Sequence, residues 1–175
     1  MIRKATENDI LRIAEIYDKT IDADLNSTSS QTGWITGVYP TAATARDALS
    51  KGELFVLEED NVIFGAAIIN KTQPPAYAKA SWKYTDAADE QIMVLHTLVI
   101  DPDTKGRGFG TQFVRFYEDY AKKDGCMYLR IDTNEKNTAA RRLYKHLGYS
   151  EIDIIPGVFN GIPDVHLVCM EKKVQ

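Results

Sequence analysis

Three glycines lie within five positions of the sequence, in the segment TKGRGFGT (104–111). The ten preceding residues, QIMVLHTLVI (91–100), are nearly all apolar, as expected of a strand that is covered on both faces. After the glycines, apolar residues recur at helical spacing as far as Lys123. This order predicts a buried strand, a glycine-rich turn and the amino terminus of a helix.

Such a turn leaves several backbone amides free at the positive end of a helix, which suits phosphate oxygens. Lys105 and Arg107 add two cationic side chains. The segment does not contain the GxxxxGK[ST] pattern of a Walker A loop, and Thr111 stands where a GxGxxG fingerprint needs its third glycine. The alternative is a connector that binds no ligand.

The rest of the chain alternates between helical and strand patterns. Apolar residues at helical spacing predict a helix over 10–21, after a short strand. Two runs of β-forming residues flank Asp60-Asn61 and predict a hairpin. The further expected segments are a long loop over 22–44, a short helix over 45–51, a loop over 73–91, a strand over 126–132, a helix from Asn137 to Gly148, and strands over 149–155 and 164–171.

Size and charge limit the possible functions. The 175 residues suit a single domain, 1–175, and 44% are hydrophobic, as in an ordinary globular protein. The net charge of −4 argues against a protein that binds nucleic acid or an anionic membrane non-specifically. A mildly cationic substrate suits this charge better.

No segment predicts export or membrane insertion. The amino terminus lacks the apolar core of a signal peptide, and no run approaches the roughly 20 apolar residues of a membrane span. Cys126 and Cys169 have neither CxxC nor His-linked metal spacing, so we expect two buried thiols and no metal site. These features favour the cytoplasm.

The glycine segment and the residues after it resemble the GNAT superfamily of N-acetyltransferases. The pyrophosphate loop of this family has the form [Q/R]xxGxG, which KGRGFG matches with Lys105 in the first position. The surrounding LHTLVIDPDTKGRGFGTQFVRFYEDYAKKDG is followed in the expected order by LRIDTNEKNTAARRLYKHLGY, which is similar to the family's next strand and Asn-x-x-Ala-x-x-x-Tyr helix. The resemblance covers nearly the whole chain.

The resemblance implies an α/β fold: a mixed, mostly antiparallel sheet of about seven strands, with helices on both faces. The fourth and fifth strands would separate to admit acetyl-CoA. Its pantetheine arm would pair with the backbone of Leu98, Val99 and Ile100, and Asn137 would contact the cofactor. The residues implied for the pyrophosphate are Lys105, Gly106, Arg107, Gly108, Phe109, Gly110 and Thr111.

The resemblance also implies a general acid, Tyr144, which would protonate the leaving thiolate. Tyr144 equally fits a helical core stripe with Leu143 and Leu147. A general base is expected because the attacking amine must be neutral, and His96, just before the cofactor-binding backbone, is the best-placed candidate. The alternative is a hydrogen-bonded core histidine; Glu90 and His166 are weaker candidates for the base.

We therefore predict acetyl transfer from acetyl-CoA to a primary amine of a small molecule, by direct attack in a ternary complex. Trp34, Tyr39 and Trp82 lie in loops that could line the acceptor side. One alternative acceptor is a peptide or protein amino terminus. A non-catalytic acyl-CoA sensor and a nucleotide-binding domain are further alternatives, and the chain is a possible homodimer.

Overall fold

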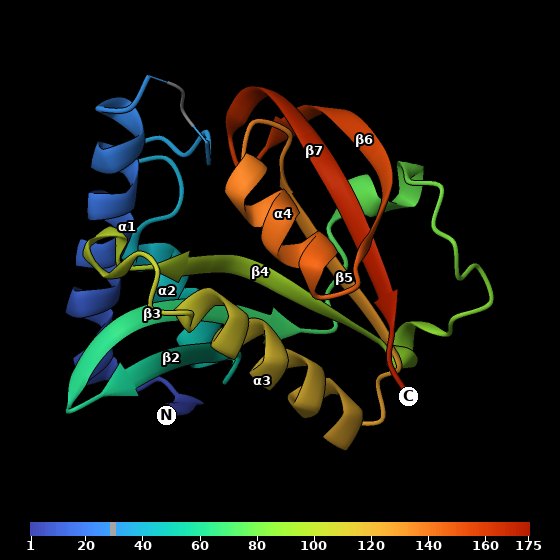
Figure 1. Ribbon diagram of the computed structural model, residues 1–175, viewed down its shortest axis with the longest axis horizontal. Coiled ribbons are helices and arrows are strands. Elements are labelled where there is room, and N and C mark those ends of the chain that lie inside the picture. The colour runs from blue at the N-terminus through green and yellow to red at the C-terminus, as the bar shows by residue number, and fades with distance from the viewer. Residues whose placement is uncertain (29–30) are drawn as a thin grey trace.

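The computed structural model describes residues 1–28 and 31–175, which form one seven-stranded sheet (Figure 1). The strand order is β1-β2-β3-β4-β5-β7-β6. All neighbouring strands are antiparallel except β4 and β5, which are parallel, so the predicted mixed sheet is confirmed. The strands are β1 (Ile2–Lys4), β2 (Leu54–Glu59), β3 (Val62–Asn70), β4 (Ile92–Ile100), β5 (Tyr128–Asn134), β6 (Ser150–Phe159) and β7 (Ile162–Lys173).

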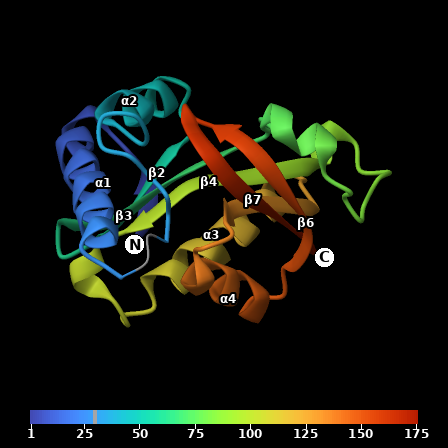
Figure 2. The ribbon, with the colours of Figure 1, turned by 90° about the horizontal axis from the view of Figure 1, so that it is seen from above.

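Helices cover both faces of the sheet, as Figure 2 shows. On one face, α1 (Ile10–Leu25) and α2 (Ala42–Ser50) enclose a core that includes Ile13 and Val56. On the other face, α3 (Phe109–Lys123) and α4 (Thr138–His146) pack on a core that includes Phe113 and Leu129. Four short 3-10 helices complete the structure: η1 (Glu7–Asp9), η2 (Pro75–Lys79), η3 (Asp89–Gln91) and η4 (Pro102–Thr104).

The two hairpins have turns of the same type. Asp60 and Asn61 both have positive φ, 52° and 61°, and join β2 to β3 as predicted. Asn160 and Gly161, with φ of 52° and 79°, join β6 to β7. The strand predicted over 149–155 is β6, which continues to Phe159. Pro156 is tolerated inside β6 because β6 is an edge strand.

Other predictions also differ in extent from the structure, and the strands predicted over 126–132 and 164–171 are β5 (Tyr128–Asn134) and β7 (Ile162–Lys173). Helix α1 continues to Leu25 and takes the first residues of the predicted 22–44 loop, whose positions 29 and 30 lie outside the described residues. The short helix predicted over 45–51 begins at Ala42, where Thr41 precedes it and its hydroxyl accepts a hydrogen bond from the Thr44 amide.

Strands β4 and β5 separate partway along their length. They pair only from Ile92 with Tyr128 to Leu95 with Ile131, although both strands continue. Directly after Leu95 and His96, Thr97 has a φ of 51°, at the point where the register between β3 and β4 shifts. The expected opening between the fourth and fifth strands is therefore present.

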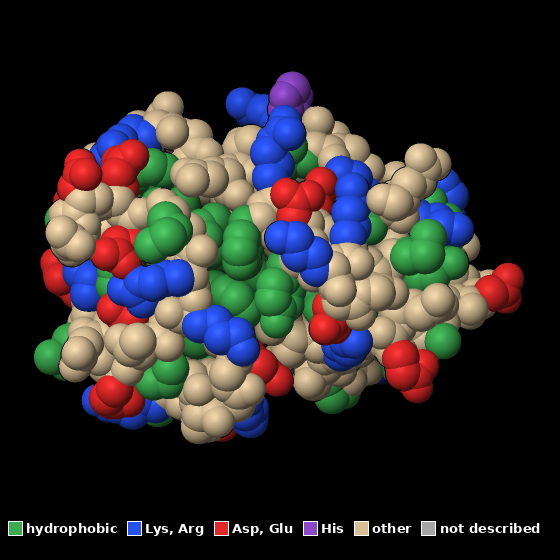
Figure 3. Space-filling model, turned by 90° about the horizontal axis from the view of Figure 1, so that it is seen from below, with side chains coloured by type: hydrophobic (Ala, Val, Ile, Leu, Met, Phe, Trp, Pro, Cys, Tyr) green, Lys and Arg blue, Asp and Glu red, His purple; other side chains and the backbone are tan. Residues whose placement is uncertain are grey.

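The surface has no single dominant charge on the face that Figure 3 shows. A central hydrophobic area is bordered by Lys and Arg side chains, with Asp and Glu side chains among them. This mixture agrees with the small net charge of −4. No helix within the described residues is both long and apolar enough to cross a membrane.

The core beneath α3 is predicted to dominate stability. Phe113 is fully buried, so Phe113→Ala should lower the free energy of unfolding by about 3–5 kcal/mol through lost contacts and a cavity. Urea unfolding measures this change. Leu11→Ala is the control: Leu11 is 77% exposed, and its loss should change stability by no more than about 0.5 kcal/mol. Equal effects of the two substitutions would contradict this assignment of the core.

Candidate active site

A cavity of about 500 Å³ lies where β4 and β5 separate. Its walls include His96, Thr97 and Leu98 of β4 and residues 132–134 of β5. Helix α4, the β6–β7 hairpin and the loops before α2 and η2 complete the walls. The cavity thus joins segments that are far apart in the sequence.

The cavity is lined from both sides of the sheet. In β5, Leu129 and Ile131 pack into the core beneath α3 and α4, so alternation places Asp132 on the opposite side. Tyr144 of α4 belongs to that same core. Asp132 and Tyr144, which both line the cavity, therefore reach it from opposite faces of the sheet.

Asp132 is a functional candidate that the sequence analysis missed. Burial raises its pKa to about 6, against the effect of the Tyr77 hydroxyl, which donates a hydrogen bond of 2.7 Å to Oδ2. The negative charge of Asp132 in turn contributes to the raised pKa values of Tyr39, Tyr144 and Cys169. In the sequence, Asp132 is recognisable only as an acidic residue at the end of a predicted strand. The neighbouring residues do not indicate that its side chain reaches a cavity.

Tyr77 is held in place by the loop that carries it. The Trp82 indole donates to the Tyr77 carbonyl at 2.9 Å, and the guanidinium of Arg130 lies 4.0 Å from the Trp82 ring centroid. Arg130 also pairs with Glu171, whose carboxylate accepts the Lys83 amide at 3.0 Å. Trp82 therefore supports the loop and does not line the cavity, whereas Trp34 and Tyr39 do line it.

His96 lines the cavity and belongs to a partly buried hydrogen-bond chain. Its Nε2 lies 2.9 Å from Asn70 Oδ1, and Asn70 Nδ2 donates to Glu53 at 2.8 Å. Burial lowers the pKa of His96 to about 4, although the Thr72 backbone acts to raise it. The imidazole is therefore neutral at physiological pH and is a weak base.

Neither weaker candidate for the base lines the cavity. Glu90 is exposed in η3, before β4 begins, whereas the cavity lies at the middle of that strand. His166 of β7 places Nδ1 2.7 Å from Glu135 Oε1. These two positions leave Asp132 and His96 as the cavity's candidate bases.

Helix α4 presents Tyr144 and Asn137 to the cavity. Burial, and then the charge of Asp132, raises the pKa of Tyr144, so its phenol keeps its proton at physiological pH. The Asn137 side chain caps the helix by accepting the Ala140 amide at 3.1 Å, as predicted, and also lines the cavity.

The open edge of β4 is formed by only some of the predicted backbone groups. The Asp101 amide donates to the Phe64 carbonyl of β3 at 2.7 Å, so alternation turns the backbone of Val99 toward β3 as well. Leu98 and Ile100 face the gap instead. Val99 also packs its side chain into the core with α1.

The glycine segment begins α3 beyond the end of β4 and does not itself line the cavity. Gly106 and Gly108 have φ of 84° and 76°, with open space where a Cβ would lie, so backbone conformation is what requires them. At Gly110 a Cβ would lie 3.2 Å from Leu143 Cδ2, a tight contact, so packing favours glycine there. Within the described residues, the amides from Gly108 to Thr111 donate to no acceptor.

The side chains of this segment differ in what they can offer a phosphate. Arg107 pairs with Glu59 and lies 4.5 Å from the Phe109 ring centroid. Phe109 is buried and stacks on Phe64, so only its backbone is available. Lys105 is exposed and forms no ion pair within the part of the chain described.

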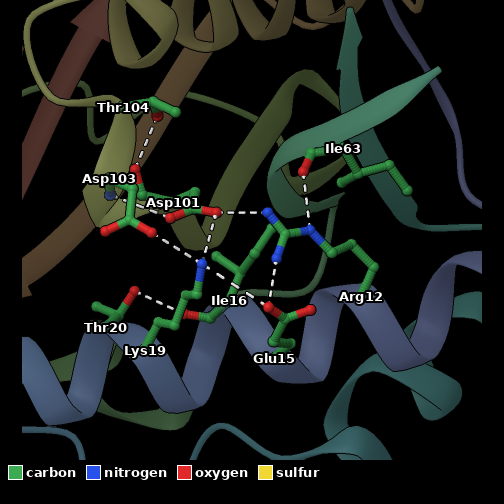
Figure 4. Close-up of polar contacts among 9 residues, drawn as sticks. All are labelled: Arg12, Glu15, Ile16, Lys19, Thr20, Ile63, Asp101, Asp103 and Thr104. Carbon is green, nitrogen blue, oxygen red and sulfur yellow. Dashed lines mark hydrogen bonds and ion pairs between the residues drawn. The ribbon is translucent and has the colours of Figure 1, made fainter. Parts of the chain in front are cut away.

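A buried ion-pair cluster anchors the start of the glycine segment (Figure 4). The Asp101 carboxylate is almost fully buried and forms ion pairs with Arg12 and Lys19 of α1. Its backbone carbonyl accepts the Thr104 amide at 2.9 Å, and Arg12 also donates to the Ile63 carbonyl at 3.1 Å. Hydrogen bonds and these cations hold the pKa of Asp101 below its usual value against the effect of burial. The cluster ties the segment to α1 and β3.

The two cysteines do not form a nucleophilic site, and the described residues do not form a metal site. Cys126 and Cys169 are free and buried, as predicted, and burial raises the pKa of Cys169 to about 12. A thiol so rarely ionised is a poor nucleophile. Among residues 1–28 and 31–175, no group of three His, Cys, Asp or Glu side chains could hold a metal ion.

Comparison with known proteins identifies the family. The model of the acetyltransferase (GNAT) family matches residues 19–149, more than half of the chain. The chain belongs to the GNAT family of acetyltransferases. A solved GNAT-family acetyltransferase from Streptococcus agalactiae has the same fold, with a TM-score of 0.82, 20% identity, and coverage of 100% of this chain and 95% of the other.

Acetyl-CoA is the acetyl donor of this family. The structure of yncA from Salmonella typhimurium, with its cofactor acetyl-CoA, has a TM-score of 0.69 and 21% identity, and the match covers 100% of this chain and 94% of that one. The residues present fit this donor: a strand edge is open at Leu98 and Ile100, and free amides lie at the start of α3.

The curated relatives match a smaller part of this GNAT chain. The N-alpha-acetyltransferase RimI of Mycobacterium tuberculosis is 35% identical over 60 residues, which is 34% of this chain and 36% of RimI. The chain spans less than half the length of the curated relatives that it matches.

Gly108→Val should abolish protection by acetyl-CoA against thermal unfolding, because the left-handed backbone that presents the amides is lost. Gly125→Val is the matched control. Gly125 has a φ of 77° and equally open surroundings, but it follows the other end of α3. Both variants should lose about 1–2 kcal/mol of stability through backbone strain. Protection retained in Gly108→Val, or lost in both, would contradict the assignment of this loop.

Proposed function

We propose that this GNAT-family protein transfers the acetyl group of acetyl-CoA to a primary amine of a small molecule, by direct attack in a ternary complex. The observation that carries the proposal is the position of Asp132, a half-buried carboxylate that reaches the cavity from the face opposite Tyr144. An amine and a thioester entering from opposite faces would meet between them.

The donor side is assigned to backbone groups and one helix start. Leu98 and Ile100 would bind the pantetheine arm, and the amides of residues 108–111 with Lys105 would bind the pyrophosphate. Asn137 would contact the same cofactor from α4. When bound, acetyl-CoA supplies an acetyl group activated as a thioester. The Leu98 amide could then polarise the carbonyl.

Asp132 would act on the acceptor. Its carboxylate attracts an alkylammonium and accepts one proton, which leaves the neutral amine that attack requires. With a pKa of about 6, it is a stronger base than an ordinary aspartate and than His96, whose pKa is about 4. We therefore assign the base to Asp132, and assign His96 to the cavity wall.

Tyr144 would act at the leaving sulfur. Its raised pKa keeps the phenol protonated, and its hydroxyl donates to no acceptor within the described residues. The phenol can therefore deliver its proton to sulfur as the carbon–sulfur bond breaks and the carbon–nitrogen bond forms. The burial that makes Tyr144 part of the core also supports its role as an acid.

Two alternatives from the sequence analysis stay open to test. The similarity to RimI over 60 residues favours a peptide or protein amino terminus as the second candidate acceptor. A non-catalytic sensor would bind acetyl-CoA without turnover.

Two free, buried thiols support a reducing compartment, and we propose that the protein is located in the cytoplasm.

Asp132→Asn should lower kcat/KM for the amine by about 10²–10⁴-fold, because an amide cannot accept the proton. Thiol release from acetyl-CoA measures this loss, and thermal protection by acetyl-CoA should persist. Asp164→Asn makes the same change at an exposed position of β7, where a φ of 54° suits Asn, and should have no effect. An Asp132→Asn variant within tenfold of the parent enzyme would refute the role.

Tyr77→Phe should move the acid limb of the pH profile. In the parent, kcat/KM should fall as the pH drops through about 6, where Asp132 becomes protonated. The Tyr77 hydrogen bond lowers that pKa, so its removal should shift the limb upward by about one pH unit. Tyr84→Phe, in the same loop, is the control. An unchanged or downward-shifted limb would contradict the assignment.

A further inference from the structure

Part of the acceptor side of the cavity has apolar walls. On the face of the sheet that Asp132 faces, Ile155, Ile162 and Leu167 of the β6–β7 hairpin belong to one buried cluster. Trp34 and Phe159 pack against this cluster and also line the cavity. A ligand that occupies this side would bury apolar surface, which is favourable in proportion to its area.

The cavity has only two charged side chains among its described lining residues, Asp132 and Lys79. Lys79 is exposed at the end of η2, whereas Asp132 is half-buried in β5. His96 is neutral at physiological pH because burial lowers its pKa to about 4. The cavity therefore offers a counter-ion to one ammonium group and to no second one.

We infer that the acceptor is a primary amine with a single positive charge and an apolar body. This inference rests on the proposed function and names the substrate class of the same site. The ammonium would pair with Asp132, and the apolar body would lie against Trp34, Phe159 and the hairpin. A second ammonium would lie in the cavity without a partner, which is costly. A carboxylate next to the amine, as in an α-amino acid, would be repelled by Asp132.

Two matched pairs of amines test the inference in the parent enzyme. Hexylamine and 1,6-diaminohexane differ by one charge on the same chain, and 2-phenylethylamine and phenylalanine differ by a carboxylate. Thiol release should give a kcat/KM at least about tenfold higher for hexylamine than for 1,6-diaminohexane, and for 2-phenylethylamine than for phenylalanine. A short peptide with a free amino terminus serves as a fifth acceptor and should be poorer than hexylamine and 2-phenylethylamine.

The possible failures separate the two proposals. Preference for the diamine, the amino acid or the peptide would overturn this inference and leave amine acetylation standing. Absence of transfer to all five acceptors, with acetyl-CoA still protecting the protein against thermal unfolding, would overturn the proposed function and this inference with it.

A charge introduced into the apolar wall gives a second test. Phe159 is partly buried at the end of β6, so Phe159→Glu adds a carboxylate to the acceptor side without opening the central core. This variant should raise the ratio of kcat/KM for 1,6-diaminohexane to that for hexylamine by about tenfold. Val62→Glu, exposed in the other hairpin, should leave the ratio unchanged. An unchanged ratio in Phe159→Glu would contradict the placement of the acceptor.

Discussion

The loss of pairing between β4 and β5 after Leu95 and Ile131 is the constraint on which the site depends. Parallel strands that stay paired leave no space between them, whereas here β4 continues paired only with β3 and β5 continues paired only with β7. The irregular backbone at Thr97 accompanies this separation and keeps β4 paired with β3. The gap gives the cavity its position and exposes the backbone edge at Leu98 and Ile100.

The separation also divides the chemistry between the two faces of the sheet. Tyr144 belongs to the core beneath α3 and α4, and Asp132 faces the side that carries Tyr77 and the apolar hairpin. The same burial raises both pKa values, yet the consequences are opposite. In the mechanism that we propose, Asp132 would be a better base, and Tyr144 would keep its proton and serve as the acid.

Much of the fold was readable because local patterns agree with it. The apolar run before the glycines predicted β4, helical spacing predicted α3, and Asp60-Asn61 predicted a hairpin turn. The extent of β6 was not readable, because only its position at the sheet edge allows Pro156. Among the site residues, the motif indicated Tyr144 and Asn137, which line the cavity, but local pattern gave no signal for Asp132.

The sequence by itself determined the order of elements and the left-handed glycines at 106 and 108, because these depend on neighbouring residues and on backbone sterics. Tertiary structure alone decided which side chains share the cavity. Tyr77 and Asp132 are 55 positions apart and meet in the folded chain, where Tyr77 packs into the core on this face and Glu171 binds the Lys83 amide of the loop after η2. The pKa of Asp132 is a result of this burial, and burial is a property of the packed chain and not of any one segment.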